Sequence, residues 1–326
     1  MLSLLAKIFR RNMQPTPAGP TQPPERGAHG ECIGVDDKSP LMQPSFSLTQ
    51  PAQHLIPLRL LDEEGELMLF TAWLGGLIGG PPFREGPMGA LEELVLDHLC
   101  AMLDTAFDSA DMLPRAAAVV PQLLAMLCGP QQSLEALAQQ VSKDKVLTAE
   151  VFRMVATPSY GNGRSVKSLD DAVNILGVAG LKSAIAKVVF KPIYRSKSTG
   201  LMHRVGKPLQ TYSELQAQHM AKICAKAGQD RFLGYLAGLM HGSGLTVAFC
   251  GMDRIGPHWP LPLSLDFVRI LHGVKDGLYA KVVRAWDLDP ALNEMCDQIS
   301  RCQPSPDTGL LSLLLRSQRE VMSARR

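Results

Sequence analysis

The sequence predicts an all-α protein, and three observations support this class. Hydrophobic residues make up 46% of the 326 residues, enough to bury a sizeable core, while aromatic residues make up only 6%. Leucine, alanine and methionine, which favour helices, are plentiful. Apolar residues recur at helical spacing, and no segment shows the alternation of a half-buried strand. With 33 basic and 31 acidic residues, the composition excludes a wholly disordered chain and a strongly basic coat protein.

The first part of the chain, residues 1–57, is rich in proline and shows no sustained apolar periodicity, which predicts a disordered leader. Residues 1–11, MLSLLAKIFRR, are amphipathic and basic at their end, and no small-residue cleavage site of a secretory signal follows them. They are either a frayed start or a segment that makes peripheral contact with a membrane surface.

Residues 58–107 are expected to form a helical N-terminal extension that packs on the following domain, with a small separate unit as the alternative. The breaker sequence Gly-Gly-Pro-Pro at 79–82 ends a first apolar helix. The next helix has its apolar face at Leu91, Leu94, Val95, His98, Leu99, Met102, Leu103 and Ala106. For His98 we expect a hydrogen-bonded core histidine rather than a ligand.

Residues 108–303 have the length of one helical domain. Three helix starts are expected at capping residues, namely Ser133, Ser168 and Thr211. The window Phe232–Met252 contains no Asp, Glu, Lys or Arg and is long enough to span a bilayer. Its many glycines and modest apolar density favour a buried core helix instead.

The chain ends with residues 304–326, a C-terminal helix and tail in which leucines precede several arginines. This helix is expected to dock on the core, with a basic amphipathic binding helix as the alternative. The seven cysteines are odd in number and include no CxxC pair, so neither a disulfide framework nor a zinc knuckle is expected. Free thiols fit a reducing compartment, and we therefore expect a cytoplasmic protein.

Charge is concentrated in two opposed blocks. Residues 58–111 hold two bases and eleven acids, whereas residues 182–213 hold seven bases and no acid. Such blocks face each other inside one chain, bind partners of opposite sign, or are simply two solvated faces. An anionic ligand, such as a nucleotide or a lipid headgroup, would be contacted by Lys182, Lys187, Lys191 and Arg195. Nucleic acid is not an expected partner, because no zinc-finger spacing, RNP aromatic pair or recognition helix is present.

A continuous series of residues runs from Leu113 to Leu181. It comprises Leu113-Pro114, Ser133-Leu134-Glu135, Leu137-Ala138, Asp144, Leu147-Thr148-Ala149, Arg153, Tyr160-Gly161, Ser168-Leu169, Ala172-Val173, Leu176-Gly177 and Leu181. This series resembles the front half of the HDOD family, bacterial signalling modules related to HD-domain phosphohydrolases. It departs from the family at Lys145, where proline is usual, and at Ala156, where asparagine is usual.

A second stretch, beginning at Phe232, looks like the helix that carries the His-Asp doublet of HD enzymes. The doublet reads His241-Gly242 here, and glycine has no side-chain oxygen to bind a metal. The upstream ligand is also missing, because His219 comes one turn too late, and Arg301-Cys302 stands where a pair of histidines is expected. A hydrolytic metal centre needs several convergent ligands, so no metal or other cofactor is expected.

The resemblance covers about 108–303 and implies an HD-like helical bundle. It also implies a non-enzymatic signalling or scaffolding module that acts in bacteria through protein–protein contacts with other signalling proteins. Such modules often act beside cyclic di-GMP, chemotaxis or motility regulation. The vestigial pocket would contain His241, Gly242 and Ser243.

Arg153, Tyr160 and Lys182 are further candidate contacts, although a salt bridge and a packed turn explain the first two equally well. Two other functions stay open. One is a residual metal-dependent phosphohydrolase with displaced ligands. The other is a sensor that binds an anionic ligand through the basic segment 182–213 without turning it over.

Overall fold

Local capping residues begin two of the three helices for which the sequence offers a cap. In the computed structural model, α6 (Leu134–Ser142) follows Ser133 and α8 (Leu169–Phe190) follows Ser168. Each serine hydroxyl accepts a hydrogen bond from the backbone N–H three residues later, at 3.2 and 3.1 Å respectively. An N-terminal N–H has no partner inside its own helix, so these side chains fix where each helix begins.

The structure describes residues 63–79, 83–104, 113, 124–125, 127–129, 133–157, 166, 168–194, 199–256, 259, 261–301 and 306–324, all within the unit 52–326. The predicted leader at 1–57 lies outside them. The described part is helical and contains no strand, only an isolated bridge between Arg84 and Ser264. Its remaining elements are α2 (Glu63–Ile78), α3 (Ala90–Asp104), α7 (Lys145–Val155), η1 (Lys191–Tyr194), α9 (Leu201–Lys226), α10 (Arg231–His241), α11 (Ser243–Ile255), α12 (Leu265–Trp286), α13 (Pro290–Arg301) and α14 (Leu310–Ser323).

The helix start predicted at Thr211 is wrong, because α9 already begins at Leu201. The carboxylate of Asp253, on α11, accepts hydrogen bonds from the N–H groups of Leu201 at 2.6 Å and Met202 at 3.0 Å. Thr211 lies inside the helix, where its hydroxyl bonds the carbonyl one turn earlier at 3.0 Å. The cap of α9 is thus supplied from a distant part of the sequence.

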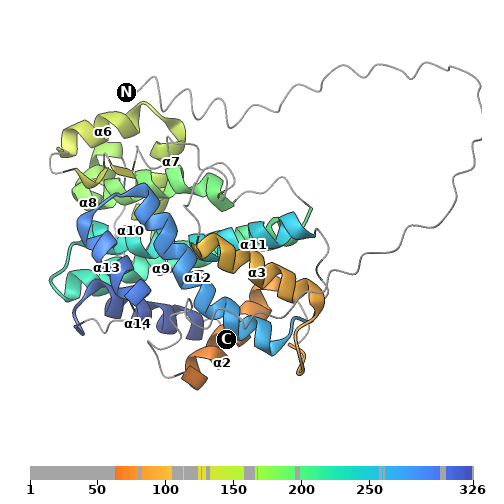
Figure 1. Ribbon diagram of the computed structural model, residues 1–326. Helices are drawn as coiled ribbons and strands as arrows, with labels where there is room; N and C mark the ends of the chain where they lie inside the picture. Colours follow the sequence, from red (N-terminus) through yellow and green to blue (C-terminus); the bar gives the residue numbers. More distant parts are fainter. Residues whose placement is uncertain are drawn as a thin grey trace, which may run out of the picture. The chain divides into compact units, whose positions relative to one another are not determined.

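Helices α9, α10 and α12 form the centre of the fold, with α11, α13 and α14 around them and α7 packed against α8 (Figure 1). Glycines let α10 approach α9 closely. A Cβ atom on Gly238 would lie 2.7 Å from the carbonyl oxygen of Gln216, and one on Gly234 would lie 2.5 Å from the Cys224 sulfur. This close contact places the end of α10, and with it His241, deep in the core.

The uncharged window Phe232–Met252 forms α10 and α11, which meet at Gly242. Two described segments are long and apolar enough to cross a membrane, Leu169–Phe190 and Arg231–Ile255. The protein itself buries 61% of the apolar window in the first and 94% of that in the second. The second segment is core, as predicted, but it is two helices rather than one.

The predicted extension contains α2 and α3. Helix α3 packs on α11 and α12, whereas α2 packs on α9, α12 and α14. The buried face of α3 is narrower than its apolar pattern suggests, because Leu94 is 55% exposed while Val95 and Leu99 are buried. His98 has a buried Nε2 atom without a hydrogen-bond partner among the described residues, so the predicted hydrogen bond is absent at this nitrogen.

Candidate functional site

His241 ends α10 and is almost fully buried. Its side chain is 5% exposed, and its Nε2 atom lies 3.4 Å from Oδ1 of Asp276 on α12. The ring meets that of Tyr279 edge-on, with the ring centroids 5.3 Å apart. The second ring nitrogen, Nδ1, has no hydrogen-bond partner in the described part of the chain. His241 is therefore held by one carboxylate and one aromatic ring.

Lys275 neutralises the carboxylate that faces His241. The lysine is 3% exposed, and its Nζ atom lies 2.6 Å from the same Oδ1 of Asp276. Burial alone would raise the pKa of Asp276, but the charge of Lys275 and the hydrogen bond from His241 hold it well below its usual range. Burial lowers the pKa of His241; the hydrogen bond to Asp276 opposes this, and the charge of Lys275 adds to it. At neutral pH the imidazole is therefore neutral and the carboxylate is ionised.

The position after His241 has no room for a side chain. A Cβ atom on Gly242 would lie 2.1 Å from Oγ of Ser213 and 3.1 Å from the hydroxyl oxygen of Tyr194. The Tyr194 hydroxyl donates a hydrogen bond to the carbonyl of Leu239 at 3.1 Å, which fixes its position. The space that the carboxylate of an HD doublet would need is thus filled by hydroxyl groups of the protein itself.

Helix α2 covers the residues of α12 beside this cluster. The ring of Phe70, which is fully buried, lies 4.7 Å from that of His272 and 5.6 Å from Nζ of Lys275. One turn further along α2, the ring of Trp73 lies 4.5 Å from that of Tyr212 on α9. Burial and the charge of Lys275 lower the pKa of His272 to about 4. Both histidines near Asp276 are therefore neutral at pH 7.

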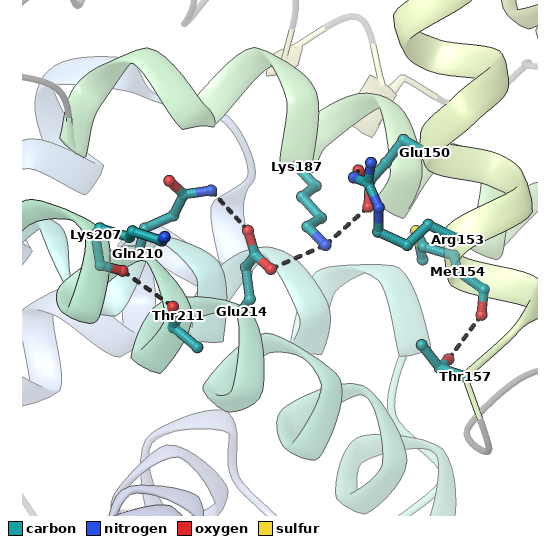
Figure 2. Close-up of polar contacts among 9 residues, drawn as sticks. All are labelled: Glu150, Arg153, Met154, Thr157, Lys187, Lys207, Gln210, Thr211 and Glu214. Carbon is teal, nitrogen blue, oxygen red and sulfur yellow. Dashed lines mark hydrogen bonds and ion pairs between the residues drawn. The ribbon is translucent and has the colours of Figure 1, made fainter.

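Lys187, a predicted contact for an anionic ligand, forms ion pairs with two carboxylates of the protein (Figure 2). Its Nζ atom lies 2.7 Å from Oε1 of Glu150 on α7 and 2.9 Å from Oε2 of Glu214 on α9. Arg153 also forms an ion pair with Glu150, and Gln210 donates to Glu214 at 2.8 Å. Burial favours a lower pKa for Lys187, but the two carboxylates outweigh it and raise the pKa. The lysine is an internal bridge between α7, α8 and α9.

The other candidates from the basic segment have different environments. Lys182 places its Nζ atom 5.4 Å from the ring centre of Phe232, a cation–π contact. Lys191 is exposed. Tyr160 and Arg195 lie outside the described residues. Arg204 and Lys207, in α9, are exposed as well. The described basic residues of this segment thus divide into two lysines engaged by the protein, Lys182 and Lys187, and three exposed side chains.

Two further residues considered at the sequence level are buried or engaged. Ser243 begins α11 and is fully buried, and its hydroxyl has no hydrogen-bond partner among the described residues. His219 faces α14, where its Nδ1 lies 2.9 Å from Oγ of Ser317 and its Nε2 lies 3.0 Å from Oε2 of Glu320. His219 thus ties α9 to α14.

The charged groups that surround His241 and Lys187 were not predicted from the sequence. Lys275 and Asp276 lie between Gly273-Val274 and Gly277-Leu278 within a helix, a pattern that indicates internal pairing of the two charges. Glu150 lies on the face of α7 that also buries Leu147 and Val151, so it too required a buried cation. Arg153 is a local partner three positions away, but the second cation, Lys187, could not be predicted from the sequence because it is 37 positions away on another helix.

The donor set near His241 does not favour a metal ion. In the ranges that the structure describes, no group of three or more His, Cys, Asp or Glu side chains is arranged to hold one. Asp276 is the carboxylate that faces His241, and the ammonium group of Lys275 already neutralises it. A metal ion there would have to displace this buried cation, which costs free energy because Lys275 would lose its partner.

Comparison with known proteins points to one family. Residues 113–255 match the model of the HDOD domain. A candidate metal-dependent phosphohydrolase from Shewanella amazonensis SB2B has a similar fold, with a TM-score of 0.53 and 17% identity over 73% of this chain and 86% of the other. An HDOD domain protein of unknown function from Geobacter sulfurreducens gives a TM-score of 0.52 and 20% identity over 72% and 79% of the two chains. No curated protein matches the sequence.

Proposed function

Because residues 113–255 form an HDOD domain, we propose that the protein is a non-enzymatic signalling or scaffolding module that acts through contacts with other proteins. The observation that carries this proposal is the filled position at Gly242. In an HD enzyme this position would hold a metal-binding aspartate, whereas here a Cβ atom would lie 2.1 Å from the Ser213 hydroxyl oxygen.

The electrostatics beside His241 support the same function. Metal-assisted hydrolysis needs several donors around one ion and an open position for water. Here the ionised Asp276 is bound to Lys275, and His241 is buried behind an aromatic ring. These residues form a neutralised internal cluster, and such a cluster contributes to the rigidity of the core rather than to catalysis.

The function as a sensor for an anionic ligand has less support. Lys187 is held between Glu150 and Glu214, so its charge is already compensated inside the fold. Lys191, Arg204 and Lys207 of the described residues in this segment are exposed and remain able to meet an anion, but exposed charges of this kind contribute little affinity individually. We therefore place protein contacts first among the three functions.

A hydrolysis assay on the full-length protein tests the non-enzymatic assignment. Bis-p-nitrophenyl phosphate is a suitable probe, supplied together with Mn²⁺, Fe²⁺ or Zn²⁺ in separate reactions. We expect the same background rate for the wild-type protein and the His241→Ala variant. A metal-dependent rate that is present in the wild type and lost in His241→Ala would overturn the proposal in favour of a phosphohydrolase.

A further inference from the structure

Helix α2 is attached to the rest of the protein by an aromatic face. Phe70 packs on His272 and Lys275 of α12, and Trp73 packs on Tyr212 of α9. Leu74, Leu77 and Ile78 complete the buried face of the helix, being 0%, 8% and 4% exposed. The surface beneath α2 therefore binds a helix through aromatic and aliphatic anchors at i, i+3, i+4, i+7 and i+8, the pattern of helix recognition between proteins.

A charge contact fixes the direction in which a helix can lie on this surface. Glu66 of α2 lies 3.2 Å from Nε of Arg319 on α14, and its side chain is only 11% exposed. The acid precedes the aromatic pair by one helical turn. A helix placed in the opposite direction would lose this ion pair, so the surface specifies an acidic residue, then an aromatic residue four positions later.

Helix α2 is intrinsically weak. Its sequence contains Gly65, Gly75 and Gly76, and each glycine inside a helix lowers its stability relative to alanine. A Cβ atom on Gly65 or Gly76 would meet nothing within 4 Å, so neither glycine is required by packing. The glycines therefore reduce the stability of the bound helix without improving any described contact.

The chain that follows α2 is firmly anchored. The backbone N–H of Arg84 donates to the carbonyl of Leu263 at 2.9 Å, and the carbonyl of Arg84 accepts from the N–H of Leu265 at 3.0 Å. The carboxylate of Glu92, 3% exposed, accepts hydrogen bonds from Arg84 at 2.6 Å, Gly89 at 2.8 Å and the Ser264 N–H at 2.7 Å. A weak helix thus adjoins a fixed point only a few residues from its end.

From these observations we propose that α2 is a displaceable occupant of its surface, and that an amphipathic helix of a partner protein binds there in its place. The partner helix would present an acidic residue, an aromatic residue four positions later and a second aromatic residue three positions after that, as Glu66, Phe70 and Trp73 do in α2. This inference rests on the proposed function, because it names the surface through which a protein contact is made.

The contacts of Arg84 keep α2 close to its binding surface and so set the affinity that a competing helix needs. A helix tethered by a short segment has an effective concentration of the order of millimolar at its own site. To displace α2 at a concentration below this value, a partner helix must bind the surface more tightly than α2 itself does. The glycines of α2 lower the affinity that the partner has to exceed. Each glycine replaced by alanine in the competing helix favours that helix about fivefold.

A synthetic helix tests the proposal directly. The probe is a fluorescein-labelled peptide of residues 63–79 in which Gly65 and Gly76 are alanine, added to the full-length protein and followed by fluorescence anisotropy. Four proteins are compared: the wild type, Trp73→Ala with a loosened α2, Gly65→Ala/Gly76→Ala with a strengthened α2, and Met68→Ala as the matched control. Met68 is on α2 but is 66% exposed.

We expect the peptide to bind Trp73→Ala at least tenfold more tightly than the wild type. Binding to the strengthened protein should be at least tenfold weaker than to the wild type, or undetectable, and Met68→Ala should equal the wild type. Equal affinity for all four proteins, or no binding to any of them, would overturn the proposal. If Trp73→Ala does not fold, the wild type and the strengthened protein decide the matter, since the proposal requires peptide binding by the wild type and its loss in the other.

The binding surface is identified by photo-crosslinking. A benzoylphenylalanine at the position of Phe70 in the peptide should label α12 near His272 and Lys275, because Phe70 contacts both residues. Labelling elsewhere would contradict the assigned surface. Failure of the peptide experiments would leave the non-enzymatic assignment intact, since that assignment depends on hydrolysis and not on α2.

Discussion

Two lysines, the partly buried Lys187 and the buried Lys275, are paired with carboxylates in very different ways. Lys187 reaches two carboxylates, from α7 and α9, and so connects three helices. Lys275 pairs with its neighbour in sequence, Asp276, and connects no other helix by this contact. Lys187 therefore holds three helices together, whereas Lys275 determines the charge beside His241 and His272. A basic residue in the sequence therefore indicates neither a ligand site nor a surface until its partner is known.

The largest loss of stability should come from removing the ion pairs of Lys187. Lys187→Met would leave Glu150, whose side chain is 6% exposed, and Glu214 close together without their shared cation. Removing one partner of a buried ion pair typically costs about 3 kcal/mol or more of the free energy of unfolding, which urea denaturation would measure. Arg153→Met is the matched control, because Arg153 is 63% exposed and its pairing should contribute less than about 1 kcal/mol.

Equal losses for the two variants would show that Glu150 is compensated from solvent and not by Lys187. In that case the assignment of Lys187 as an internal partner of Glu150 would be wrong. The basic segment 182–213 would then again be a candidate surface for an anionic ligand.

A smaller loss of stability is expected from adding one methyl group at Gly242, the residue after His241. Gly242→Ala would place its Cβ atom against the Ser213 hydroxyl, and overpacking of this kind costs about 2 kcal/mol. Gly256→Ala is the control, since a Cβ atom there meets nothing within 4 Å. Adding Ser213→Ala to Gly242→Ala should restore most of the lost stability, because it removes the clashing oxygen. Without such a rescue, the filled position would not be the cause of the loss.

The smallest effect is a dependence of stability on pH, which arises from His272 beside Lys275. The pKa of His272 is about 4 in the folded protein and about 6.5 when exposed, so the unfolded chain binds the extra proton between these values. Stability should therefore fall as the pH drops from 6.5 towards 4, by roughly 1 to 2 kcal/mol at pH 5, in thermal or urea unfolding. The groups near His272 are Lys275, Asp276 and His241, with Phe70 covering its ring.

His272→Gln should reduce this slope without abolishing it, because the pKa of His241 is also lowered by burial. A slope that His272→Gln leaves unchanged would assign the effect to other groups. Lys187 should contribute nothing in this range, since its two carboxylate partners raise its pKa further above the ordinary value of a lysine.

Much of the fold could be predicted from the sequence where the causes are local. Ser133 and Ser168 cap helices through N–H groups three residues away, and the helical class follows from spacing alone. The start of α9 could not be predicted, because its cap is Asp253, about fifty residues later. Thr211 looked like a cap because its neighbours have the right types, yet the turn before it is already helical.

The candidate site divides in the same way. The sequence has Gly242 where the resemblance places the aspartate of an HD doublet, and the HDOD resemblance is confirmed over residues 113–255. The groups that surround Gly242 could not be predicted, because Ser213 and Tyr194 come from other elements. The partners of Lys187 and the cover of α2 over His272 likewise depend on contacts between distant segments.

Metal content is the measurement that tests the central claim most directly. The full-length protein and its His241→Ala variant would be exchanged against Zn²⁺, Mn²⁺ and Fe²⁺, freed of unbound ions and analysed for bound metal per chain. With Gly242 unable to carry a ligand and Asp276 bound to Lys275, we expect far less than one metal per chain and no difference between the two proteins. One tightly bound metal per chain that disappears in His241→Ala would contradict the account and establish a metal centre at α10 and α12.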